Sequence, residues 1–340
     1  MKAALLEKID APLVIRELLP TMLMPGQVLV KVKASGICGA QLHEIRGHKG
    51  NEKFLPHPMG HEGCGIVKEV GPGVTTVKEG DKVVMHWRPG AGIESDFPKY
   101  VINNTDKLIT GGKCTTLSEE SIVSENRVTK VPSDTPTVLA AMLGCSLTTA
   151  LGIIDNECDL KFGESVAVVG CGGVGLNLLQ SAKMRSAFPI YGVDINDKMM
   201  DLSVQMGADV YASSLDNIPH KVDVILDTTG IPAVISQAFD KLAPSGRLIL
   251  VGQPQPGTSL NILNPLSFFD GQGKSVRASQ GGGTKPEVDI PRYVALANRG
   301  IIDYETLHTD TFKLDEINDA FDLLKSGNAG RIIIKMEEEV

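Results

Sequence analysis

Residues 165–194 contain a pattern that commonly binds dinucleotides. A short β-branched run, Ser165–Val169, leads into glycines with G-x-G-x-x-G spacing and then into a stretch with helical periodicity. Such glycines allow a tight turn, close approach of a pyrophosphate and close helix–strand packing, and the helix N-terminus offers free N–H groups to the anion. The residues predicted to bind the cofactor through this turn are Gly170, Gly172, Gly173, Val174 and Gly175.

A carboxylate follows the second strand of this unit. The strand, Ile190–Val193, ends at Asp194, nineteen residues after Gly175. A carboxylate in that place accepts hydrogen bonds from a ribose diol and repels a 2′-phosphate. We therefore expect NAD as the cofactor in preference to NADP. The alternative that these residues leave open is a methyltransferase-like α/β sheet, which can carry a similar glycine turn.

The elements around the turn alternate between strand and helix. From about Leu147 onward, short apolar runs are separated by helical stretches, which is typical of a doubly wound parallel sheet with a Rossmann architecture. The predicted strands are Val166–Val169, Ile190–Val193, Val222–Leu226 and Arg247–Val251.

Strand and turn signals dominate the chain before this region. Predicted strands cover Val28–Val32, Gly65–Val70 and Lys82–Met85, and residues 71–81 form a turn-rich connection. After the glycine-rich stretches Gly252–Asn264 and Gly281–Gly283, two helices and a last strand are predicted, at Ile290–Arg299, Leu314–Lys325 and Arg331–Lys335. We expect residues 1–148 and 281–340 to form one β-rich domain, which a cofactor domain of residues 149–280 interrupts.

Composition limits the function classes. The 340 residues are 42% hydrophobic and carry a formal net charge of −8, which argues against a nucleic-acid or membrane-surface partner. We expect a cytoplasmic protein, because no apolar run suits a secretory signal or a membrane span. The six cysteines include no C-x-x-C pair, so we expect thiols or metal ligands rather than a disulfide framework.

Three further segments resemble the zinc-dependent medium-chain alcohol dehydrogenases. They read S-G-I-C-G-A-Q-L-H at 35–43, P-M-G-H-E-G-C-G-I-V at 58–67 and M-L-G-C-S-L-T-T-A-L-G at 142–152. The resemblance covers essentially the whole chain and implies a GroES-like catalytic domain beside the Rossmann domain. It places the catalytic zinc ligands at Cys38, His61 and Cys145, with Glu62 as the acid beside the metal. Two thiolates and an imidazole leave a fourth tetrahedral position for water or substrate. Taken singly, each of the three residues could instead be a buried core residue.

The resemblance also implies contacts with the cofactor and the substrate. Thr149 matches a residue that touches the nicotinamide, Lys198 a lysine at the adenosine ribose, and Arg331 an arginine at the pyrophosphate. Each of these three could instead be a solvated or capping side chain. The substrate pocket is expected at His86, Trp87 and Arg88, where a histidine and an arginine favour a polar or anionic alcohol, although Arg88 could equally be a surface ion-pair partner.

The chain departs from the family pattern in two places. Residues 85–125 contain only Cys114, so we expect no structural zinc, and the segment 86–100 replaces the four-cysteine lobe. Ala40 stands where the family usually has the hydroxyl that starts a proton relay, and Gln41 follows where an acid is common. His43 matches the terminal histidine of the relay, but it would need water or the ribose hydroxyls as a link.

These patterns predict an alcohol dehydrogenase that uses one zinc ion and NAD. Hydride would pass from a polar alcohol, such as a polyol, sugar derivative or cyclitol, to the nicotinamide in a cleft between the domains. Homodimers and homotetramers are common in the family, and we expect one of them here. Two alternatives remain open, namely a zinc-free quinone or enoyl reductase of the same fold and a non-catalytic NAD-binding sensor.

Overall fold

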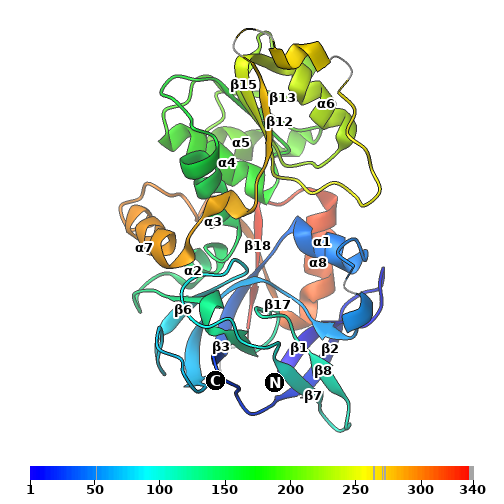
Figure 1. The fold of residues 1–340 in the computed structure, drawn as a ribbon, viewed down its shortest axis with the longest axis vertical. Helices are drawn as coiled ribbons and strands as arrows, with labels where there is room; N and C mark the ends of the chain where they lie inside the picture. Colours follow the sequence, from blue (N-terminus) through cyan, green and yellow to red (C-terminus); the bar gives the residue numbers. More distant parts are fainter. Residues whose placement is uncertain (51, 263–264, 270, 272, 337–340) are drawn as a thin grey trace.

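The computed structural model describes residues 1–340 except 51, 263–264, 270, 272 and 337–340. One half of the molecule, at the top of Figure 1, is built on a six-stranded parallel sheet. Its strands, in spatial order, are β13 (Val210–Ala212), β12 (Ile190–Val193), β11 (Val166–Val169), β14 (Val222–Asp227), β15 (Leu242–Leu250) and β16 (Ser275–Ala278). The doubly wound parallel sheet predicted from the sequence is confirmed.

The central strands of this sheet are buried because helices cover the sheet. Every residue of β11 and β12 is buried, as expected for continuous β-branched runs in a parallel sheet. The helices of this half are α4 (Gly173–Met184), α5 (Met200–Gln205) and α6 (Pro232–Lys241). The helix that follows the glycine turn, α4, therefore begins at the carboxyl end of β11, where ligands bind in such sheets.

The other half is built on two antiparallel or mixed sheets. The seven-stranded sheet contains β10 (Val128–Lys130), β6 (Lys82–His86), β5 (Glu62–Val70), β3 (Gln27–Ile37), β18 (Arg331–Lys335) and β17 (His308–Lys313), and β9 (Glu120–Ser124) pairs with β3. The five-stranded sheet contains β4 (His57–Pro58), β1 (Lys2–Leu6), β2 (Val14–Pro20), β7 (Lys99–Ile102) and β8 (Leu108–Thr110). This arrangement confirms the β-rich, GroES-like half.

The last strand of the chain pairs with a strand from its first part. β18 runs antiparallel to β3, so that Ile333 lies opposite Gly36. Residues near both ends of the sequence therefore share one sheet, although the predicted boundaries at 148 and 281 remain a prediction. Asn264, the last residue of the predicted glycine-rich stretch, lies outside the described residues.

Helices fill the junction between the two halves (Figure 1). They are α1 (Gly39–Ile45), α2 (Thr137–Met142), α3 (Ser146–Gly152), α7 (Pro286–Ala297) and α8 (Ile317–Ser326). Short 3-10 turns occur at η1 (Glu52–Phe54), η2 (Glu125–Arg127), η4 (Asp197–Met199), η5 (Leu215–Asn217), η6 (Pro265–Phe269), η7 (Gly281–Gly283) and η8 (Leu314–Glu316), and η3 (Ile153–Glu157) is a π-helical turn. None of the described helices combines the length and apolar character needed to cross a membrane.

The predicted elements differ from the observed ones mainly at their ends. The helix predicted at Ile290–Arg299 begins earlier, at Pro286, because proline suits the first helical position. The helix predicted at Leu314–Lys325 starts as a 3-10 turn and ends at Gly327, which adopts a left-handed conformation with φ of 69°. The polar strand β17 was not predicted, because its pairing with β18 is a tertiary contact.

Candidate active site

The three candidate metal ligands converge from three separate elements. Cys38 lies at the start of α1, His61 directly before β5, and Cys145 at the start of α3. The Cys38 Sγ lies 3.2 Å from the His61 Nε2, and the three candidate ligand atoms all lie within 4.8 Å of one another. The structure therefore brings together residues separated by more than one hundred positions in the sequence.

The three groups perturb one another electrostatically. A hydrogen bond from Cys145, with further help from nearby His61, holds the pKa of the Cys38 thiol well below its ordinary value. The same hydrogen bond raises the pKa of Cys145 well above its ordinary value, and burial adds to the effect. Burial alone would lower the pKa of His61, but the adjacent Cys38 outweighs it and the net shift is upward. These shifts make Cys38 the more acidic of the two thiols.

The donor set suits zinc. Zinc binds thiolate sulfur at about 2.3 Å and imidazole nitrogen at about 2.0–2.1 Å, so two ligand atoms of a tetrahedral ion lie roughly 3.5 Å apart. The separation between Cys38 and His61 is close to this value. Three protein ligands and access to a cavity match a catalytic site, which keeps one position open, better than a closed structural site.

Gln41 stands where the family commonly has an acid, and it has a structural contact in this chain. Its side-chain Oε1 accepts a hydrogen bond of 2.8 Å from the backbone N–H of Cys38. This bond joins the third position of α1 back to its N-cap residue. Gln41 therefore fixes the backbone that carries the first candidate ligand.

Glu62 is tied to the last strand of the chain. Its carboxylate contacts the guanidinium of Arg331, and the two side chains are 0% and 2% exposed. The second carboxylate oxygen accepts a 3.2 Å hydrogen bond from the backbone N–H of Ser146, next to Cys145. Glu62 thus links the neighbours of two candidate ligands to β18. Burial raises the pKa of Glu62, while the charge of Arg331 opposes that shift.

Arg331 also lies beneath the glycine turn. A Cβ atom added to Gly173 would lie 2.6 Å from the Arg331 Cδ, so a larger residue at this turn would displace the arginine. The expected role of Arg331 was contact with the cofactor pyrophosphate. In the structure, its guanidinium pairs with Glu62, while its side chain supports the first residue of α4.

The glycine turn has the shape that a pyrophosphate site requires. Gly170 has a φ of +89°, and a Cβ on Gly175 would lie 1.9 Å from the Gly170 carbonyl oxygen. These two positions therefore admit only glycine without rearrangement. An added Cβ on Gly172 would meet nothing within 4 Å, which leaves open space directly at the N-terminus of α4. The residues present fit a dinucleotide.

Asp194 helps to fix the same turn. Its carboxylate accepts a 2.7 Å hydrogen bond from the backbone N–H of Cys171 and a 2.9 Å hydrogen bond from that of Asn196. The side chain is partly exposed beside the turn, where a ribose would lie. Lys198 is exposed in η4, four residues further on, and Thr149 lines the cavity from α3.

His43 lies in α1 and lines the cavity with its neighbour Ala40. Its Nδ1 lies 3.3 Å from the Nδ1 of His48, and the two ring centroids are 5.4 Å apart. Burial lowers the pKa of His43, and the charges of His48 and Arg46 act in the same direction. A neutral His43 facing the cavity can accept a proton, and His48 provides a second imidazole next to it.

Of the three predicted pocket residues, only Trp87 lies among the lining residues described for the cavity. His86 is 2% exposed; its Nδ1 donates to the Arg88 carbonyl oxygen at 2.7 Å and its Nε2 accepts from Thr129 Oγ1 at 2.9 Å. The Arg88 guanidinium donates to the backbone carbonyl oxygens of Thr284 and Gln280. Both side chains therefore have hydrogen-bond partners within the protein, and the expectation that His86 and Arg88 face the substrate stays a prediction.

One cavity of about 620 Å³ joins these features. The candidate ligands and His43 line it from the catalytic half, while Gly172–Gly175, Thr228 and Gln253 line it from the parallel-sheet half. Two aromatic residues that the sequence analysis did not single out, Phe54 and Phe97, also line it. Their places in irregular segments gave no periodic signal that could have identified them.

Two family comparisons match most of the chain. The Alcohol dehydrogenase GroES-like domain family matches residues 24–133, and the Zinc-binding dehydrogenase family matches residues 173–299. An S-(hydroxymethyl)glutathione dehydrogenase of Escherichia coli O157:H7 is 30% identical, over 91% of this chain and 92% of that protein.

Solved structures agree in fold over nearly the whole length. An alcohol dehydrogenase zinc-binding domain protein from Burkholderia ambifaria has a TM-score of 0.89 and 26% identity, with 99% of both chains covered. Benzyl alcohol dehydrogenase from Acinetobacter calcoaceticus has a TM-score of 0.86, also with 26% identity and 99% coverage of both chains. The chain therefore belongs to the zinc-dependent medium-chain alcohol dehydrogenase family and is an oxidoreductase of the alcohol dehydrogenase type.

Proposed function

We propose that this protein oxidises an alcohol, or reduces the matching carbonyl compound, with NAD and one catalytic zinc ion. The observation that carries the proposal is the single cavity shared by the cluster Cys38, His61 and Cys145 and by the glycine turn Gly172–Gly175. When bound, zinc would supply a Lewis acid for the alcohol oxygen, and NAD would supply the acceptor for the hydride.

The residues of the chain have separate tasks in this proposal. Cys38, His61 and Cys145 would hold the metal, and the ion pair of Glu62 with Arg331 fixes the start of the strand that follows His61. The backbone N–H groups at the start of α4 would bind the pyrophosphate. The expected contacts of Thr149 with the nicotinamide and of Lys198 with the ribose remain part of the proposal.

Proton removal is assigned to His43. It faces the cavity, and its lowered pKa leaves it neutral and able to accept a proton near pH 7. Ala40 has no hydroxyl that could pass the proton from the alcohol to His43. We therefore propose water in the cavity or the cofactor ribose as the link. Glu62 is proposed as a positioning acid beside the metal, because its carboxylate is buried and paired.

Asp194 favours NAD over NADP in this proposal. Its carboxylate lies beside the turn, where a 2′-phosphate would bind, and a carboxylate there repels that phosphate. A cytoplasmic location remains part of the proposal. A homodimer or homotetramer remains the expected assembly.

The test is an NAD reduction screen over alcohols, polyols and sugars, combined with elemental analysis of the same protein preparation. The proposal predicts NADH formation with at least one alcohol and about one zinc per chain. Turnover by a zinc-free preparation would support a quinone or enoyl reductase instead. NAD binding without turnover on any alcohol would support a sensor.

A further inference from the structure

The wall of the cavity beside the metal cluster is aromatic. The β5–β6 ladder ends at the pair of Glu62 and His86, which are the chain neighbours of His61 and Trp87. Both His61 and Trp87 line the cavity. The indole of Trp87 and the candidate ligand His61 therefore border the same space.

The Trp87 ring is held in one position. A Cβ atom on Gly281 would lie 2.6 Å from the indole Cζ2, so only glycine allows the ring to lie against this turn. The Arg88 guanidinium lies over the ring, with its Cζ 5.9 Å from the ring centroid, and donates to the carbonyl oxygens of Gln280 and Thr284. Arg88 and Gly281 thus act as positioning residues for the indole.

The segment that follows Trp87 is also rigidly attached. The Glu125 carboxylate accepts a 2.7 Å hydrogen bond from the Ile93 backbone N–H, and Glu94 contacts Lys113 at 2.6 Å and Arg127 at 3.1 Å. Arg127 in turn donates to the carbonyl oxygen of Trp87. The segment 86–100 replaces the cysteine lobe of related enzymes, and these bonds fix it as a wall of the cavity.

The segment 86–100 contains a second aromatic residue, Phe97, near its end. Phe97 and Phe54 line the cavity, their ring centroids lie 6.3 Å apart, and the rings are tilted by 34°. They remain 50% and 45% exposed, which is unusual for a pair of large apolar rings. An apolar ligand group in the cavity would cover surface that is otherwise left in water.

We propose that the alcohol substrate carries an aromatic ring that packs against Trp87, Phe54 and Phe97. This inference rests on the proposed function and replaces a polar substrate class with an aromatic one. Offset or edge-to-face contacts with fixed rings add to the gain from burying the ring itself. With NAD bound, the C–H bond of the ring-bearing carbinol carbon would break with transfer of hydride to the nicotinamide. The hydroxyl proton would leave toward His43, so that an aromatic aldehyde or ketone and NADH would form.

Polar side chains also line the cavity, among them Glu44, Lys49 and His57. Glu44 lies 3.6 Å from the His57 Nε2, and both residues line the cavity on the side of α1 and β4. The expectation of a polar substrate rested on His86 and Arg88, which are directed to protein partners. The residue directly after β6 that lines the cavity is Trp87.

The test compares three alcohols that share a primary hydroxyl, namely benzyl alcohol, cyclohexylmethanol and glycerol. The wild-type kcat/KM should rank benzyl alcohol first, roughly tenfold above cyclohexylmethanol, with glycerol lowest. Phe97→Leu and Trp87→Leu should each reduce the ratio of benzyl alcohol to cyclohexylmethanol roughly 3- to 10-fold, the worth of one aromatic pair. A wild-type preference for glycerol, or ratios unchanged in both variants, would overturn the proposal.

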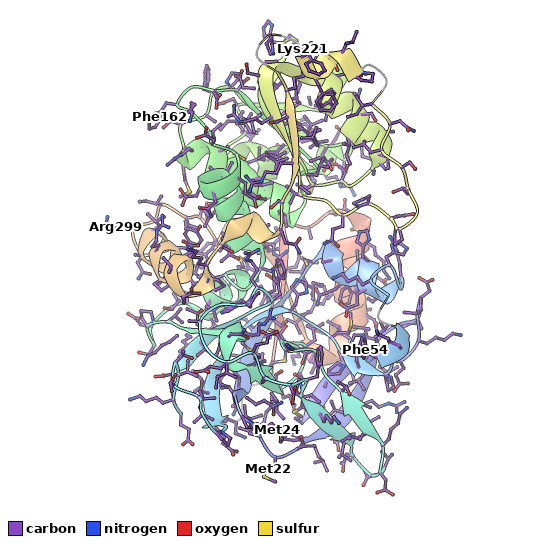
Figure 2. All side chains as sticks on the ribbon, viewed as in Figure 1. Met22, Met24, Phe54, Phe162, Lys221 and Arg299 are labelled. Carbon is purple, nitrogen blue, oxygen red and sulfur yellow. The ribbon has the colours of Figure 1, made fainter. Side chains whose placement is uncertain are left out.

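Phe162→Leu is the matched control. Figure 2 shows Phe162 in the parallel-sheet half, on the side of the molecule opposite to Phe54, and it is 84% exposed. The control removes an exposed ring without touching the cavity, so its substrate ratio should equal that of the wild type. Phe97 is itself half exposed, so Phe97→Leu should leave the fold intact.

A binding experiment separates this inference from the proposed function. Trp87 is the single tryptophan of the chain, so its fluorescence reports on this cavity alone. Benzyl alcohol should change the emission with a saturable dependence on concentration, with a higher affinity than glycerol, even in a preparation that shows no turnover. Turnover without preferential aromatic binding overturns the inference and leaves the proposed reaction intact. Aromatic binding without turnover of any alcohol overturns the proposed reaction, and with it the substrate class, but leaves the aromatic binding site.

Discussion

The guanidinium of Arg331 is paired with the carboxylate of Glu62, 269 residues earlier in the chain, with almost no exposure of either side chain. The pair joins the strand that follows His61 to the residue that supports the glycine turn at Gly173. One buried contact therefore couples the candidate metal cluster to the cofactor turn. Loss of either charge should affect both sites.

Glu62→Gln should lower the free energy of unfolding by about 3–5 kcal/mol, because it leaves the buried charge of Arg331 without a partner. Urea denaturation of the purified protein measures this change. Asp322→Asn is the control, since Asp322 forms an exposed pair with Lys325 and its loss should cost at most about 1 kcal/mol. Equal effects of the two substitutions would show that the Glu62 pair is not buried as described.

The imidazole of His86 should make stability depend on pH. Burial lowers the pKa of His86 to about 4 in the folded chain, against an ordinary value of 6.5. Between these values the unfolded state binds more protons, so the free energy of unfolding should fall as the pH drops from 6.5 toward 4. The total loss from this group is about 3 kcal/mol.

His86→Asn tests this dependence, because asparagine keeps a donor for the Arg88 carbonyl but cannot be protonated. Unfolding measured at several pH values from 7 to 4 should give a shallower slope for the variant. His220→Asn serves as control, since it removes a histidine from an exposed position. If the slope of His86→Asn matches that of the wild type, the imidazole does not stay neutral in the folded protein.

Local spacing in the sequence was sufficient to predict the glycine turn and the strands around it. Gly170 and Gly175 are defined by a strand, a turn and a helix within a short segment, and the structure places them as the pattern requires. The positions of Cys38, His61 and Cys145 followed from family resemblance, and the structure brings them together. Neither result depends on knowing a long-range contact in advance.

Long-range contacts determine the features of the site that the sequence did not predict. His86 and Arg88 lie at the end of β6, where the resemblance implied a substrate pocket, but their side chains form hydrogen bonds with Thr129 and Thr284. Sequence spacing cannot reveal this, because the partners lie 43 and 196 residues away. The place of Phe97 in the cavity wall could not be predicted for the same reason, because Glu94 and Arg127 fix its segment through tertiary contacts.

Asp194→Asn should narrow the preference for NAD over NADP. The amide oxygen can still accept a hydrogen bond from the Cys171 N–H, while the charge that repels a 2′-phosphate is gone. Because like charges about 4 Å apart near a surface repel by a few kcal/mol, the ratio of kcat/KM values should fall by about tenfold or more. A ratio that stays at the wild-type value would mean that Asp194 does not face the ribose.

His43→Gln should lower kcat by on the order of 10²-fold, the usual contribution of a general base. The wild-type kcat should decline as the pH falls through a pKa below 6.5, because protonated His43 cannot accept a proton, and the variant should lack this decline. Ala40→Ser restores a hydroxyl for the relay from the alcohol to His43. It should change the pH dependence of kcat more than the affinity for NAD. An unchanged rate and profile in His43→Gln would leave bulk water as the proton acceptor.

Zinc dependence is the central claim, and removal and return of the metal tests it most directly. NADH formation from benzyl alcohol is measured for the purified protein, for the same protein after chelation, and after zinc is added back. We expect activity to disappear with the metal and to return at about one zinc per chain, while Cys38→Ser stays inactive but still binds NAD. Full turnover by the metal-free protein would contradict the account.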